Sequence, residues 1–429
     1  MLMKYYSLNK QTPDVSFKEA VINGLAPDKG LYFPKTIPTL PKDFFVNIDQ
    51  YSFHEIAFEV IKPYVTPDIP EDELQKIITD SLNFPIPLVS LEKNLFTLEL
   101  FHGPTMAFKD IGARFMARCL AYFNKNEETP VTILVATSGD TGSAVANGFL
   151  GVNGVDVVIL YPKGKVSKIQ EKQLTTLGQN ITAIEIDGVF DNCQDMVKTA
   201  FLDTEITKKR KLTSANSINI ARWLPQMFYY FFMYKQLRER TKDIVVSVPS
   251  GNFGNICAGM LAQQMGLPIK RFIASVNANK VVPNYLRTRN YVPIRSIQTI
   301  SNAMDVGNPS NFVRIKELYK QNFELLQQHL TAFSYTDTET KEAMIELHDK
   351  YDYTADPHGA VGYLGLKEHL KSDETGVFIE TAHPIKFLDV VKEVLKMKLE
   401  IPEQIQKVIR KKKVSIPIKT YEELKAFLS

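Results

Sequence analysis

Lys109 is the residue whose position most directly suggests chemistry. It ends the apolar run 103–109 and directly precedes residues 111–123, whose apolar side chains recur three and four positions apart, as in a helix with Asp110 as its N-cap. Burial and the partial positive charge of a helix N-terminus both disfavour an ammonium group. We therefore expect a lysine that loses its proton readily and could form a Schiff base, with a solvent-exposed lysine of no special role as the alternative.

Two short loops combine glycine with hydroxyl or amide side chains between an apolar strand and a helix. Residues 135–143 (VATSGDTGS) precede an expected helix at 144–150, and residues 248–255 (VPSGNFGN) precede an expected helix at 256–265. Such loops let the backbone approach a ligand, and the free N–H groups of the helix N-terminus bind anions. We expect the first loop to bind a substrate carboxylate and the second a phosphate. Glycine placed there for packing alone is the alternative for each loop.

Several other chemistries lack their motifs in this sequence. Neither loop reads Gly-x-Gly-x-x-Gly, and no Gly-x-x-x-x-Gly-Lys-[Ser/Thr] or His-Glu-x-x-His occurs. We therefore expect no dinucleotide site, no P-loop and no metal centre. His102, His358 and His383 flank the motif regions, and we expect each of them to be structural rather than catalytic.

The loops must be positioned by strands and helices, and the sequence indicates where these lie. Short runs rich in β-branched residues alternate with helical patterns from about residue 131 onward. The expected strands are 131–136, 155–160, 181–186, 244–248, 271–276 and 376–380. This alternation is typical of an α/β protein with mainly parallel sheets.

The rest of the chain differs in character from this alternating region. Helices are expected at 51–62 and 71–82, before two prolines mark a boundary, and the aromatic stretch 223–237 is expected to be a buried core helix because it is too short to span a bilayer. The resulting division is an N-terminal domain (1–92), a catalytic core (93–400) and a C-terminal appendage (401–429).

Composition restricts the class of protein and its partners. The 429 residues are 44% hydrophobic and 23% charged with a net charge of +3, which is ordinary for a globular protein and argues against a nucleic-acid or membrane partner. The basic run 407–413 lacks aromatic residues, and we expect a solvated face there. Three scattered cysteines and an N-terminus without an apolar run predict no disulfide framework, no secretory signal and a cytoplasmic location.

A Schiff-base lysine, a carboxylate loop and a phosphate loop are together what a pyridoxal-phosphate enzyme acting on an amino acid requires. The sequence resembles the threonine synthase family, which belongs to the fold-type II (tryptophan synthase β-like) pyridoxal-phosphate enzymes. The resemblance rests on the motif 101–112, on both loops, and on the segments 15–27, 214–219, 303–311 and 356–360. It implies an α/β fold with two open, mostly parallel α/β lobes and a smaller N-terminal domain.

The same resemblance implies a role for individual residues. Lys109 would be the catalytic residue and would form the internal aldimine with pyridoxal 5′-phosphate. The cofactor-binding residues would be Gly251, Asn252, Phe253, Gly254 and Asn255 at the phosphate, Thr381 at the pyridine nitrogen and Asp140 near the 3′-oxygen. The substrate-binding residues would be Thr137, Ser138, Gly139, Thr141, Asn216 and Arg222, and further candidates for the substrate phosphate are Lys163, Lys165, Asn219, Ser310 and Asn311.

The implied reaction converts O-phospho-L-homoserine and water into L-threonine and phosphate. Two alternatives stay open from the sequence: a phosphohomoserine lyase that gives α-ketobutyrate, and a catalytically silent scaffold that retains the fold. The expected partner is a small-molecule substrate, and the sequence leaves both a monomer and a homodimer open.

Overall fold

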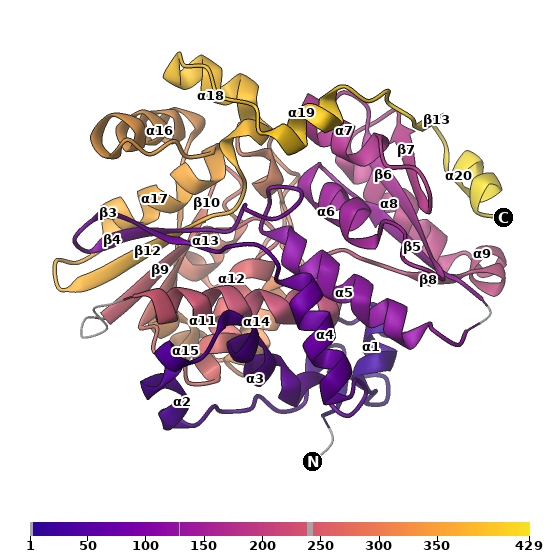
Figure 1. Cartoon of the computed structure of the whole chain (residues 1–429), viewed down its shortest axis with the longest axis horizontal. Coiled ribbons are helices and arrows are strands. Elements are labelled where there is room, and N and C mark those ends of the chain that lie inside the picture. The colour runs from indigo at the N-terminus through magenta and orange to yellow at the C-terminus, as the bar shows by residue number, and fades with distance from the viewer. Residues whose placement is uncertain (1–2, 128, 238–242) are drawn as a thin grey trace.

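The computed structural model describes residues 3–127, 129–237 and 243–429, and its strands form two larger sheets and one small antiparallel pair (Figure 1). The first sheet has the order β11 (Leu330–Ser334), β10 (Arg271–Val276), β9 (Asp243–Pro249), β12 (Glu374–Glu380), β4 (Leu95–Glu99) and β3 (Leu88–Glu92). The second has the order β13 (Ile416–Ile418), β7 (Ile181–Ile186), β6 (Val155–Pro162), β5 (Val131–Ala136) and β8 (Lys211–Thr213). The small pair is β1 (Tyr5–Ser7) with β2 (Tyr32–Pro34).

Pairing in the two larger sheets is almost entirely parallel. The exception is β3, which runs antiparallel to β4 at the edge of the first sheet. The second sheet is parallel throughout. Strands of a parallel sheet are rich in β-branched residues because helices cover both faces of the sheet. The observed parallel pairing confirms the expected α/β class with mainly parallel sheets.

The helices between the strands fall into groups along the chain. The N-terminal part holds α1 (Phe17–Asn23), α2 (Lys42–Val46), η1 (Ile48–Gln50), α3 (Phe53–Val65) and α4 (Glu71–Ser81). The second sheet is accompanied by α5 (Lys109–Phe123), α6 (Asp140–Phe149), α7 (Lys168–Thr175), α8 (Phe190–Leu202) and α9 (Thr204–Lys209). The middle of the chain contributes α10 (Ile220–Trp223), η2 (Leu224–Gln226), α11 (Met227–Gln236), α12 (Gly254–Gln264), α13 (Val281–Thr288), η3 (Asn302–Met304), α14 (Phe312–Leu318) and α15 (Phe323–His329). The C-terminal part holds α16 (Asp337–Tyr351), α17 (Pro357–His369), η4 (Pro384–Phe387), α18 (Leu388–Leu395), α19 (Glu403–Ile409) and α20 (Tyr421–Leu428).

The N-terminal helices close the core on one side. In the view of Figure 1 they lie along the bottom, beneath α5, α11 and α12. Helix α3 packs on α11, and α4 packs on α5. Helix α3 begins with a capping box in which Ser52 and Glu55 satisfy each other's backbone N–H groups. Its first residue, Phe53, stacks on Phe232 of α11 with ring centroids 4.2 Å apart.

The aromatic stretch 223–237 is buried as expected, but it is not one helix. The 3-10 turn η2, with Pro225 in its first turn, separates α10 from α11. Proline lacks the N–H that an α-helix would need at this point, so the path changes there. The residues of α11 from Met227 to Tyr234 are all buried, and none of the helices in the described residues reaches the length and hydrophobicity that crossing a bilayer needs.

The C-terminal segment joins the second lobe. Strand β13 pairs with β7 at the edge of the second sheet, α19 packs on α7, and α20 packs on α8 (Figure 1). Lys413 from the basic run lies between Glu171 and Glu185 as a counter-ion. The division at residues 92 and 400 stays a prediction.

Candidate active site

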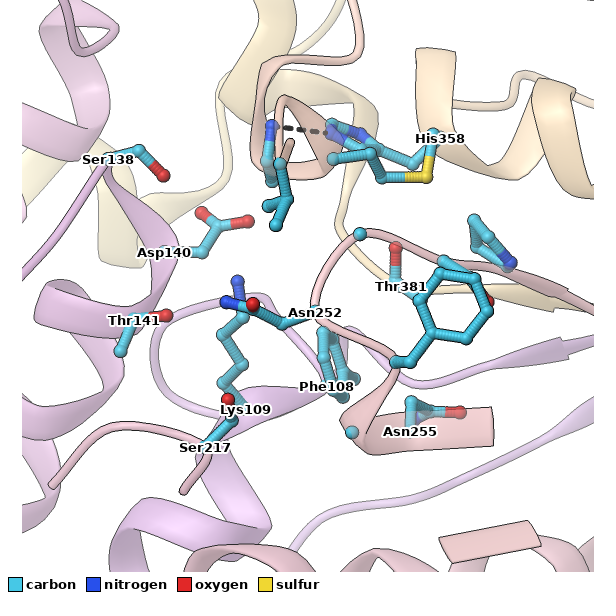
Figure 2. Close-up of a pocket in the computed structure, with 18 of the residues that line it drawn as sticks. Phe108, Lys109, Ser138, Asp140, Thr141, Ser217, Asn252, Asn255, His358 and Thr381 are labelled. Carbon is cyan, nitrogen blue, oxygen red and sulfur yellow. Dashed lines mark hydrogen bonds between the residues drawn. The ribbon is translucent and has the colours of Figure 1, made fainter. Parts of the chain in front are cut away.

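One cavity lies where strands from both sheets end. It is lined by residues that directly follow β5, β9 and β12, and by Lys109 at the start of α5. Ligands of open α/β sheets bind outside the carboxyl ends of the strands, since loops there converge with helix N-termini. Figure 2 shows the Lys109 amine pointing into the middle of this cavity, with the Asp140 carboxylate on one side and Thr381 across from it.

Lys109 is held by its neighbours in the loop before α5. The Phe108 N–H donates to the Thr381 carbonyl oxygen at 2.8 Å, and the Tyr229 hydroxyl donates to the Phe108 carbonyl oxygen. Burial lowers the pKa of Lys109 to about 8, against the opposing effect of the Asp140 carboxylate and with the help of two nearby cations, Lys386 and Arg222. The amine is therefore much easier to deprotonate than an ordinary lysine.

The expected N-cap role of Asp110 is wrong. Helix α5 begins at Lys109, and its N-cap position is occupied by Phe108, which makes no side-chain cap. The Asp110 side chain turns back instead and accepts hydrogen bonds from the N–H and the hydroxyl of Thr105, at 2.9 and 2.5 Å. Asp110 thus fixes the turn before the helix, which is what aims Lys109 into the cavity.

The first anion loop, after β5, forms the N-terminus of α6. This helix begins at Asp140, four residues earlier than the sequence suggests. The turn is organised by Thr137, whose hydroxyl oxygen accepts from the N–H groups of Gly139 and Gly142 at 2.9 and 2.8 Å. Thr137, Ser138, Asp140 and Thr141 line the cavity, whereas Gly139 does not and serves the turn through its φ of 141°.

Asp140 has two partners that the sequence analysis did not single out. Its Oδ1 lies 2.6 Å from the Nζ of Lys386, which belongs to η4, and accepts from Gln170 Nε2 at 2.9 Å. Burial alone would raise the pKa of Asp140, but the charges of Lys386 and Lys109 outweigh it and the pKa is lowered. No local pattern could have identified Lys386, because its partner lies far away in the sequence.

The second anion loop, after β9, forms the N-terminus of α12. A Cβ on Gly251 would lie 2.7 Å from Met304 Cα, so only glycine fits against the neighbouring loop. Phe253 takes the left-handed conformation with φ of 60° and stands at the N-cap position of α12. The Asn252 side-chain oxygen accepts from the Ser310 hydroxyl at 3.0 Å. Residues 250–255 all line the cavity.

Two of the candidates for binding the substrate phosphate line the cavity, namely Asn216 and Arg222. Arg222 is buried, and burial lowers its pKa to about 10, which leaves it a cation at neutral pH. Its Nη1 donates to the Ala215 carbonyl oxygen, whereas its buried Nε has no hydrogen-bond partner among the described residues. This unpartnered Nε lies beside Gly112 of α5, while the Arg222 side chain lines the cavity.

The other phosphate candidates do not line this cavity. Lys163 and Lys165 are exposed in the loop after β6. Asn219 is buried and caps α10, Asn311 is buried beside Arg314, and Ser310 lines a neighbouring cavity.

The histidines near the motifs are held in structural hydrogen bonds. His358 Nε2 accepts from the Ala303 N–H at 3.2 Å, so its Nδ1 donates to Asp356 Oδ1, 2.5 Å away. This pair supports the 302–306 loop, which lines the cavity (Figure 2). Burial lowers the pKa of His383 to about 4, and its Nδ1 accepts from the Ile385 N–H.

The residues of the cavity fit pyridoxal phosphate. An amine of lowered pKa faces a glycine turn at a helix N-terminus, as a Schiff base and an anionic phosphate require. The buried Asn255 Nδ2 in that turn has no hydrogen-bond partner among the described residues, although its Oδ1 accepts from the Tyr230 hydroxyl at 2.5 Å. The part of the chain that is described contains no group of His, Cys, Asp or Glu suited to a metal ion.

Comparisons with known proteins agree with this fit. Residues 81–382 match the family model for pyridoxal-phosphate dependent enzymes, residues 4–82 match that for the threonine synthase N terminus, and residues 359–428 match that for the threonine synthase C-terminal region. A threonine synthase of Haemophilus influenzae is 45% identical over 406 residues, which cover 94% of each chain.

Solved structures give the same result in three dimensions. The crystal structure of threonine synthase from Escherichia coli superposes with a TM-score of 0.94 at 41% identity and covers 99% of both chains. The structure of pyridoxal-phosphate-bound threonine synthase from Brucella melitensis superposes with a TM-score of 0.93 at 32% identity, covering 99% of this chain and 98% of that one. The cavity, the family models and these relatives lead to one conclusion: the chain belongs to the threonine synthase family of pyridoxal-phosphate-dependent enzymes.

Proposed function

We propose that this protein converts O-phospho-L-homoserine and water into L-threonine and inorganic phosphate in the cavity around Lys109. The observation that carries the proposal is one readily deprotonated amine in a cavity that is also lined by the glycine turns at the N-termini of α6 and α12. The glycine turn at α12 suits the phosphate of the cofactor, and the guanidinium of Arg222 suits that of the substrate. An enzyme that uses a phosphorylated cofactor and releases phosphate from its substrate needs both.

The cofactor would be held from three sides of the cavity. Lys109 would bind it covalently, and residues 251–255 would bind its phosphate through backbone N–H groups and the Asn255 amide. Thr381 and Asp140, which lie across the cavity from one another, would face its ring (Figure 2). When bound, pyridoxal phosphate supplies an electron sink that stabilises negative charge on substrate carbon atoms.

The substrate would be bound by the α6 turn and by the Arg222 region. Ser138 and Thr141 offer hydroxyl groups and a helix N-terminus to the substrate carboxylate. Thr137 contributes by shaping this turn, because its hydroxyl oxygen already accepts two backbone N–H groups. Asn216 and Arg222 would bind the substrate phosphate and hold it as the Cγ–O bond breaks.

Lys109 is the group best placed to move protons during the reaction. The overall change breaks the Cγ–O bond to phosphate, adds the oxygen of water at Cβ and redistributes protons among the α, β and γ carbons. An amine whose pKa lies at about 8 exchanges protons in either direction near neutral pH. One mobile Nζ can therefore serve more than one protonation step.

The test is an incubation of the purified protein with pyridoxal phosphate and O-phospho-L-homoserine, in which phosphate, threonine and α-ketobutyrate are measured in the same sample. Equal amounts of phosphate and threonine are expected. Phosphate with α-ketobutyrate would instead assign a lyase outcome, and absence of phosphate release would assign a non-catalytic protein. Lys109→Ala is the control for turnover at this cavity.

We also propose a cytoplasmic location. The three cysteines, Cys119, Cys193 and Cys257, are all free and buried, as is usual in a reducing compartment. Fractionation of cells that express the protein, with activity measured in each fraction, tests this assignment.

A further inference from the structure

Lys386 is a second lysine beside the cavity, and it is more deeply buried than most charged residues are. It lies in η4, a few residues after Thr381, and none of its surface is exposed. Its Nζ lies 2.6 Å from Asp140 Oδ1 and donates to the Thr105 carbonyl oxygen at 2.8 Å. A buried ammonium is costly unless it is paired, so its partners must be integral to the site.

The segment that carries Lys386 is joined directly to the segment that carries Lys109. Ala107 and Ala382 form an isolated antiparallel bridge, and the His383 N–H donates to the Met106 carbonyl oxygen at 3.1 Å. Together with the Lys386 bond to Thr105, these contacts hold the two backbones in one register. Lys386 is therefore fixed relative to Lys109 by the backbone as well as by its ion pair.

Asp140 pairs directly with Lys386, and its charge also acts on Lys109. The negative charge of Asp140 stabilises the Lys109 ammonium and raises its pKa. Lys386 and Arg222 carry the same charge as that ammonium and lower its pKa. Lys386 is the strongest charge that keeps Asp140 ionised. Asp110 is the next residue in the chain, but its carboxyl group accepts from the Thr105 N–H and hydroxyl, and burial raises its pKa.

We infer that Lys386 is a positioning residue that acts as the counter-ion of Asp140, so that the Lys109 ammonium gives up its proton readily. The inference rests on the proposed function only in that this amine is the one that binds the cofactor and moves protons. Without Lys386 the buried carboxylate would need another source of positive charge, and the nearest is the Lys109 ammonium. Lys386 thus prevents Asp140 from trapping Lys109 in its protonated form.

The inference is tested on the full chain without cofactor or substrate. Trace amounts of acetic anhydride label neutral amines, and mass spectrometry of the peptide that contains Lys109 gives its labelling as a function of pH. The wild-type midpoint is expected near 8. Lys386→Met should move the midpoint up by about one pH unit or more, and Asp140→Asn should move it down, because charges within about 4–6 Å shift a pKa by about 1–3 units.

The double variant separates electrostatics from simple damage to the fold. Asp140→Asn/Lys386→Met removes both charges, and its midpoint should return to within about half a unit of the wild type, since the two shifts of about 1–3 units oppose each other. If the single substitutions acted by damaging the fold, their effects would add in the double variant instead of cancelling. Lys407→Met, at a side chain that is 71% exposed, is the matched control and should leave the Lys109 midpoint unchanged.

An unchanged midpoint in Lys386→Met, or a double variant that does not move back towards the wild type, would overturn the inference. If Lys386→Met does not fold, as judged by circular dichroism, the comparison of Asp140→Asn with the double variant is decisive. The Lys109 midpoint must then be higher in the double variant than in Asp140→Asn. Equal midpoints in these two variants would refute the role of Lys386. These measurements need no turnover, so failure of the wild-type threonine assay would refute the proposed function alone.

Discussion

The two turns that face Lys109 are built alike but differ in charge. Both follow a parallel strand and form the N-terminus of a helix, α6 in one case and α12 in the other. The α12 turn contains only neutral donors, and its shape is set by Gly251 and Phe253. The α6 turn carries Asp140, which a buried lysine must neutralise. One turn therefore offers backbone shape alone, whereas the other also brings a negative charge that acts on Lys109.

The largest expected effect comes from removing the group that both turns face. Lys109→Ala should lower turnover by about a thousandfold or more, since the same amine serves as nucleophile and as general acid and base. The fold should persist, because neither turn takes its hydrogen bonds from the Lys109 side chain. Phosphate release and the circular dichroism spectrum provide the measurement, and substantial remaining threonine formation would contradict the role of Lys109.

A second substitution at Lys109 tests its lowered pKa through the free energy of unfolding. The folded-state pKa of Lys109 lies at about 8, below its ordinary value of 10.5. Between these two pH values the unfolded chain binds more protons at this residue than the folded chain does, so the free energy of unfolding rises with pH across that window. Below pH 8 both states carry the charged lysine, and its loss of solvation in the folded state lowers the free energy of unfolding by about 3 kcal/mol.

Lys109→Met removes that cost. We expect the cofactor-free variant to be more stable than the wild type at pH 7, by about 2–3 kcal/mol, and the difference to shrink towards pH 10.5. Urea unfolding of both proteins at pH 7 and pH 10 measures it, and the wild-type curve serves as the reference for all other titrating groups. A variant that is less stable at pH 7 would contradict a lowered pKa.

The neutral turn is tested by adding one methyl group. Gly251→Ala places a Cβ against the backbone of Met304 and the carbonyl oxygen of Ala303, at 2.7 and 3.0 Å, so the turn must shift. Overpacking of this kind costs about 1–3 kcal/mol, and we expect pyridoxal phosphate to bind about ten- to a hundredfold more weakly. Equilibrium dialysis measures the affinity.

A control for this change lies away from the cavity. Gly148 in α6 is buried, and a Cβ there would lie 3.0 Å from the backbone of Ala113, so packing must adjust although neither residue lines the cavity. Gly148→Ala should retain nearly wild-type cofactor affinity. Equal losses in the two variants would mean that general packing, and not the shape of the turn, sets the affinity.

The smallest effect is expected at a lysine that the sequence offered as a phosphate ligand. Lys163 follows β6 and is exposed, outside the lining of the cavity. Lys163→Ala should therefore change the KM for O-phospho-L-homoserine by less than about twofold, because an exposed charge is screened by solvent. Arg222→Gln, which removes a buried cation from the cavity wall, should raise KM at least about tenfold. Equal effects of the two substitutions would contradict the assignment of Arg222.

Features that depend on local sequence were predictable. Strands β5, β7 and β10 have the boundaries that their β-branched runs indicate, and the two glycine loops form helix N-termini as expected. The starts of α6 and α12 were placed two to four residues too late, because Gly139 and Phe253 adopt conformations with positive φ that the sequence pattern does not reveal. Asp110 was misassigned for a related reason, since a side chain that can cap a helix can equally cap the turn before it.

The sequence by itself determined the family, and it predicted the reactive lysine and the two turns that face it. These are written in short motifs, where neighbouring residues act together. The tertiary structure alone decided which charges surround that lysine. Lys386, Asp140 and Arg222 come from three different elements, and the tertiary fold brings all three close enough to act on Lys109. Because an unpaired charge is costly in a desolvated site, the protonation of Lys109 depends on how these three charges are arranged around it. No periodicity or spacing along the chain indicates that arrangement.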